Sequence, residues 1–67
     1  MKFELKGEHI ALCDLLKTVG IAQSGGQGKV FVADGNVMVD GAIELRKTAK
    51  IRKGQVVACF GETIEVS

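Results

Sequence analysis

The feature that most constrains the fold is the stretch of residues 24–29, which reads Ser-Gly-Gly-Gln-Gly-Lys and precedes a hairpin-like run over residues 35–41. Ser24 followed three residues later by Gln27 is a capping box, which predicts the N-terminus of a helix. The backbone amides of the two glycines after the serine would stay free, with the positive end of the helix dipole behind them. Such a helix start suits a phosphate oxygen, and this points toward nucleic acid.

The first half of the chain predicts one strand and two helices. Phe3 and Leu5 alternate with charged residues, which is typical of a half-buried strand. Apolar residues recur at helical spacing over residues 12–19, and Gly20 follows in a position typical of a C-cap. The second helix is expected to run from Ser24 to residue 33 or 34, where Gly35 ends it in the same way.

The second half predicts short strands separated by turns that contain glycine. We expect these strands at residues 36–40, near 42–45, at 55–60 and at 63–66. This order predicts an α+β fold, a two-helix pair packed on a small, mostly antiparallel β-meander. The 67 residues form one domain, because a chain of this length supports a single small core.

The charges are unevenly distributed, although the net charge is only +1. Residues 46–53, called here the basic segment, hold five basic residues and no acid. Lysines and arginines in such a segment can contact successive phosphates without reading bases. The chain has no Trp or Tyr, and we expect its three Phe in the core, so stacking on exposed bases is not expected.

The cysteine and histidine content argues against catalysis and metal binding. Cys13 and Cys59 lie in apolar patterns, and we expect both to be buried and unbridged. With His9 as the one imidazole, no set of acid, base and nucleophile can be assembled, so we expect no enzyme activity, no metal and no cofactor. No apolar run is long enough for a membrane span and no signal-peptide pattern is present, which favours a cytoplasmic protein.

A longer pattern resembles a known family. It covers residues 12–57 and consists of Leu12, Leu15, Leu16, Gly20, Ser24, Gly28, Lys29, Val32, Gly35, Val37, Val39, Asp40 and Gly41, followed by Lys53, Gly54, Gln55 and Val57. This spacing resembles the RNA-binding domain named after the fourth small-subunit ribosomal protein, in particular its stand-alone bacterial members. The resemblance implies that two helices and the following hairpin form an alpha-L motif that docks on structured RNA.

The resemblance also implies which residues contact RNA. The start of the second helix and the basic segment would share one face of the domain, and the contact residues would be Ser24, Gly25, Gln27, Lys29, Arg46, Lys47 and Lys50. The implied partner of this expected monomer is ribosomal or transfer RNA, bound through its phosphate backbone. The alternative that the sequence leaves open is a small protein-interaction adaptor, which an exposed apolar patch would favour.

Overall fold

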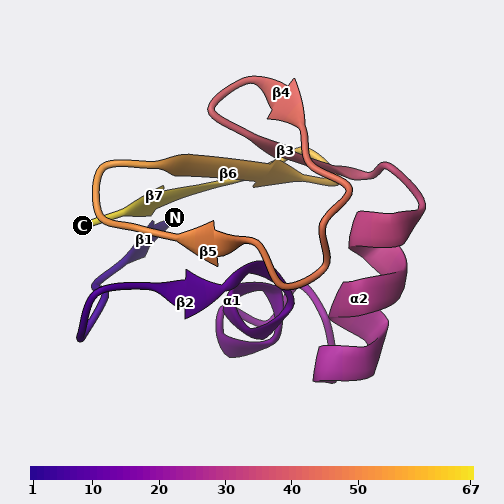
Figure 1. The fold of residues 1–67 in the computed structure, drawn as a ribbon, viewed down its shortest axis with the longest axis horizontal. Coiled ribbons are helices and arrows are strands. Elements are labelled where there is room, and N and C mark those ends of the chain that lie inside the picture. Colours follow the sequence, from indigo (N-terminus) through magenta and orange to yellow (C-terminus); the bar gives the residue numbers. More distant parts are fainter.

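The computed structural model describes all 67 residues and contains two helices on one side of a five-stranded sheet (Figure 1). The helices are α1 (Leu12–Thr18) and α2 (Gly25–Ala33). The strands are β1 (Lys2–Phe3), β2 (Ile10–Ala11), β3 (Val37–Val39), β4 (Ala42–Ile43), β5 (Lys50–Ile51), β6 (Val56–Cys59) and β7 (Glu62–Val66). The predicted α+β class is confirmed. Neither helix is long and apolar enough to cross a membrane.

Both helices end where the glycines predicted. Gly20 and Gly35 adopt φ values of 86° and 80°, in the left-handed region that glycine enters without a steric penalty. Each glycine lies one residue beyond a C-cap, Val19 for α1 and Asp34 for α2. The chain therefore leaves each helix sharply, and α1 and α2 pack against each other as a compact pair.

The five-stranded sheet has the order β1-β7-β6-β3-β4, which departs from a sequential meander at two points. β6 pairs with β3 instead of β4, so β4 remains an edge strand. β1 pairs with β7 in parallel, and this brings the two ends of the chain together (Figure 1). The other pairings are antiparallel, as expected. The chain leaves the sheet after β4 because the following residues pack on the start of α1.

A second, two-stranded sheet was not predicted. β2 pairs with β5 in antiparallel register, with Ile10 opposite Ile51 and Ala11 opposite Lys50. Residues 50 and 51 of the basic segment, where the sequence analysis expected no strand, therefore form β5. Ile51 is 1% exposed and anchors the segment to the core, whereas Lys50 points into solvent.

The core lies between the helices and the inner face of the large sheet. It consists of Leu5, Leu12, Leu15, Leu16, Ala22, Val32, Val37, Ala49, Ile51, Val57, Cys59, Ile64 and Val66. Cys13 and Cys59 are both buried and free, as predicted. Phe3 and Phe31 pack against this core, but the prediction for Phe60 is wrong, because its side chain is 59% exposed. Phe60 occupies the turn between β6 and β7, which carries it beyond the edge of the core.

Candidate nucleic-acid interface

The start of α2 is capped as the sequence predicts, with one difference. Ser24 is the N-cap, and its Oγ accepts a hydrogen bond of 3.0 Å from the Gln27 N–H. The Gln27 side chain returns to the backbone N–H of Gln23, one residue earlier than in a standard capping box, at 2.6 Å. Neither contact uses the N–H groups of Gly25 and Gly26, which make no hydrogen bond within the chain. These two donors remain at the positive end of the α2 dipole.

α1 and α2 approach each other most closely at Gly28. A Cβ atom built on this buried glycine would lie 2.7 Å from the carbonyl oxygen of Cys13 and 3.2 Å from its Cα. Real Cβ atoms do not come this close to backbone, so only glycine fits between the two helices here. Gly28 therefore serves the packing of the two helices. This contact sets the position of the next residue, Lys29, on the exposed side of α2.

The basic segment serves as the N-terminal cap of α1. Ala11, the N-cap residue of α1, makes no capping bond with its side chain. The first two helical N–H groups instead donate to carbonyl groups of the basic segment: Leu12 to Ala49 at 2.9 Å and Cys13 to Lys47 at 3.1 Å. These contacts satisfy donors that would otherwise be unpaired in a mostly buried position. The basic segment is consequently held in place by backbone hydrogen bonds.

The start of α2 and the basic segment both contact the backbone of one residue, Cys13. Its N–H donates to the Lys47 carbonyl, and its carbonyl oxygen lies against Gly28. Two segments that are far apart in the sequence are thus held against the same residue of α1. Lys29, Lys47 and Lys50 are exposed and form no ion pair. A shallow hollow of about 330 Å³ lies on the basic segment, lined by Arg46, Thr48, Ala49 and Lys50.

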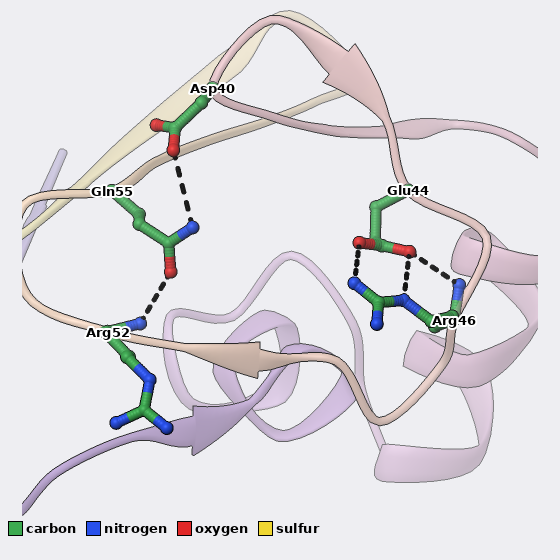
Figure 2. Close-up of polar contacts among 5 residues, drawn as sticks. All are labelled: Asp40, Glu44, Arg46, Arg52 and Gln55. Carbon is green, nitrogen blue, oxygen red and sulfur yellow. Dashed lines mark hydrogen bonds and ion pairs between the residues drawn. The ribbon is translucent and has the colours of Figure 1, made fainter.

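Two acids modify this basic surface, and the sequence analysis missed both. Arg46 forms the single ion pair of the chain, with Nε and Nη2 each 3.0 Å from the Glu44 carboxylate (Figure 2). The Arg46 N–H also donates to Glu44. The second acid, Asp14, has its Oδ1 3.7 Å from the point where a Cβ of Gly25 would lie. The pairing of Glu44 with Arg46 could have been predicted from the sequence, since the two residues are only two positions apart. The position of Asp14 beside Gly25 could not, because it depends on helix packing.

A second polar cluster holds the turn at residues 52–55 against the β3–β4 turn (Figure 2). Asp40 adopts a positive φ of 51°, and its carboxylate accepts hydrogen bonds from the Val56 N–H at 2.9 Å and from Gln55 Nε2 at 3.3 Å. Gln55 Oε1 in turn accepts the N–H of Arg52 at 2.8 Å. These hydrogen bonds fix the C-terminal end of the basic segment, and the contacts with α1 fix the part that precedes it.

The ion pair of Glu44 with Arg46 leads to a testable prediction about the pKa of Glu44. Hydrogen bonds from the Arg46 side chain and backbone lower the pKa of Glu44 to about 2. Arg46→Ala should raise this pKa toward the usual range for glutamate, about 4.3, as measured by NMR titration of the side-chain carboxyl; the backbone N–H of residue 46 still donates to Glu44 and keeps the pKa below that range. Because the folded-state pKa is depressed, the pair stabilises the fold above the pKa of the unfolded chain, and this contribution is lost as pH falls toward about 2. A Glu44 pKa that Arg46→Ala leaves unchanged would contradict the pairing.

The comparisons with known proteins agree with one another. A family model described as the S4 domain matches residues 3–67. YbcJ of Escherichia coli strain K12, which is provisionally named as an RNA-binding protein, is 49% identical over 61 residues, covering 91% of this chain and 87% of YbcJ. YbcJ of Shigella flexneri matches to the same extent. The solution structure of Escherichia coli YbcJ, reported to contain an alpha-L motif involved in RNA binding, superposes with a TM-score of 0.74 at 48% identity, covering 97% of this chain and 84% of that one.

Proposed function

The chain belongs to the S4 domain family, and we propose that it is a non-catalytic RNA-binding protein. In this proposal the start of α2 and the basic segment dock together on the phosphate backbone of structured RNA. The contact residues are those that the sequence predicted, namely Ser24, Gly25, Gln27, Lys29, Arg46, Lys47 and Lys50. The names of the relatives support RNA as the class of partner.

The observation that carries the proposal is that both segments contact the backbone of Cys13. Because Gly28 and Lys47 contact opposite ends of one residue's backbone, the cationic side chains next to them are presented from a rigid frame. The backbone that carries these cations needs no reordering when they contact phosphates, which favours a folded RNA of matching shape. Ribosomal and transfer RNA are the folded RNAs to which we assign the surface.

Other properties of the chain fit a binding role. Burial raises the pKa of the Cys59 thiol, which disfavours the thiolate that nucleophilic catalysis requires. Both thiols are free, as in proteins of a reducing compartment, and we place the protein in the cytoplasm. We propose that it acts as a monomer.

The test is to identify the RNA directly. The chain is expressed in bacterial cells, crosslinked by ultraviolet light, purified under denaturing conditions, and the attached fragments are sequenced. We expect fragments from a few folded RNAs, with the crosslinked peptides mapping to residues 24–29 and 46–53. Fragments spread evenly over messenger RNA, or crosslinks confined to other parts of the chain, would contradict the proposal.

A further inference from the structure

The outer face of the large sheet, which faces away from both helices, carries exposed apolar side chains. Met38 on β3 is 40% exposed and Ile43 on β4 is 62% exposed. They are paired across the strands, and Met38 is also paired with Ala58 on β6, so the three side chains form one row on this face. The helices that cover the inner face leave this row uncovered (Figure 1).

Phe60 continues this apolar surface at the turn between β6 and β7. Its φ is 51°, and with Gly61 at 79° it forms a two-residue turn in which Asn or Gly would be favoured. A bulky side chain in the left-handed region costs stability, and a ring that stays 59% exposed recovers only part of the burial that a core phenylalanine gains. Phe31 holds the ring of Phe60 in an edge-to-face contact, with the centroids 4.8 Å apart. The result is a preorganised aromatic ring that faces solvent.

Two hollows flank Phe60, and they share only Phe60 and Glu62 as lining residues. The first, of about 350 Å³, is lined on the outer face by Met38, Ile43, Ala58 and Thr63 among others. The second, of about 340 Å³, is lined by Met1, Val19, Gly20 and Ile21. Glu62 is the only charged side chain in either lining, and the N-terminal ammonium group donates to the Thr63 carbonyl at 2.6 Å.

We propose that this surface docks a short segment of a partner protein, one that carries apolar side chains beside a lysine or arginine. The apolar side chains of the partner would fill the two hollows on either side of the Phe60 ring, and its cation would pair with the Glu62 carboxylate. RNA is not the occupant proposed, because no lysine or arginine lines either hollow to contact phosphate.

The area of the proposed surface favours a short segment over a second copy of the chain as the partner. A stable protein–protein interface buries about 800 Å² on each partner. This would be about a fifth of the whole accessible surface of 4029 Å², which is more than a few side chains around two hollows provide. A short segment needs less area when it inserts anchor side chains beside a rigid aromatic ring. The proposal thus adds a protein-binding surface to the RNA-binding surface and does not depend on it.

The test places a photoreactive group at the proposed surface. The chain with p-benzoylphenylalanine in place of Phe60 is expressed in bacterial cells and irradiated, and a chain with the same group in place of the exposed Glu8 is the matched control. We expect a protein adduct from position 60 only, with the crosslink mapping to a segment that contains apolar residues and a lysine or arginine. Glu62→Lys should reduce this adduct about tenfold or more, because it reverses the charge that pairs with the partner.

The second measurement uses a synthetic peptide that copies the mapped segment. Its affinity for the purified chain, measured by calorimetry, should fall about tenfold or more with Phe60→Asn, as expected when an aromatic anchor is removed. Asn suits the left-handed turn position, so this variant should stay folded, which circular dichroism checks. Adducts with RNA or with a second copy, a mapped segment without a cation, no adduct at all, or unchanged affinity with Phe60→Asn would each overturn the proposal.

Discussion

Replacing Gly28 by alanine should lower the free energy of unfolding by about 1–3 kcal/mol, which is a large fraction of the stability of so small a domain. The new Cβ would lie 2.7 Å from the carbonyl oxygen of Cys13, and neither atom belongs to a flexible side chain. α1 and α2 must therefore move apart, and this loosens buried contacts on both helices. Urea denaturation, monitored by circular dichroism, measures this change in free energy. We also expect the melting temperature to fall by roughly 4–8 °C per kcal/mol.

Gly26→Ala is the matched control, because it makes the same chemical change in the same helix. A Cβ at Gly26 would meet only the Ser24 side-chain oxygen, at an ordinary contact distance of 3.8 Å. Alanine favours helix over glycine by up to about 1 kcal/mol, so this variant should be at least as stable as the parent. If Gly28→Ala also matched or exceeded the parent in stability, the close helix contact at Cys13 would be disproved.

The second large effect concerns RNA affinity. Replacing Lys29 and Lys47 together by alanine should reduce the slope of log affinity against log salt concentration by roughly 1.4–1.8, since each lost phosphate contact contributes about 0.7–0.9. At moderate ionic strength this corresponds to an affinity loss of about tenfold to a hundredfold. The measurement is a binding titration at several salt concentrations, using an RNA recovered by crosslinking. Preference among RNA sequences should hardly change, because phosphate contacts carry no base information.

The control for this variant changes the net charge by the same amount elsewhere. Lys2 and Lys6 are exposed and lie in and after β1, which pairs with β7 at the opposite edge of the large sheet from β4. Replacing both by alanine should leave the salt slope within about half a unit of the parent. Equal losses in the two double variants would show that only the overall charge matters and would remove the support for a localised surface.

Glu44→Gln should act in the opposite direction. In the free protein the Glu44 carboxylate neutralises Arg46, whose side chain is otherwise 80% exposed. Releasing this arginine should steepen the salt slope by up to about one unit and strengthen RNA binding. A weaker affinity would instead mean that Glu44 holds Arg46 in the orientation that RNA requires. No change in affinity or slope would exclude Arg46 from the interface.

The elements that the sequence predicted correctly depend on local chemistry. The Ser24 hydroxyl caps α2 only three residues away, and the glycines at positions 20 and 35 end the helices through their own backbone freedom. Alternation of apolar and polar residues identified β3, because the side chains of a strand point alternately to two faces, and an apolar run between turns identified β6. Each of these patterns lies within a few consecutive residues, so the sequence alone is enough to predict the element.

The features that only the tertiary structure decided arise between distant segments. The pairing of β2 with β5 involves two residues on each strand, too few to leave a periodic pattern. The basic segment caps α1 with main-chain carbonyl groups, which every residue type carries, so no side chain marks this role. The exposure of Phe60 likewise depends on where the core ends and not on its own hydrophobicity. The site itself belongs to this second class, because Gly28 and Lys47 are related only through their separate contacts with Cys13.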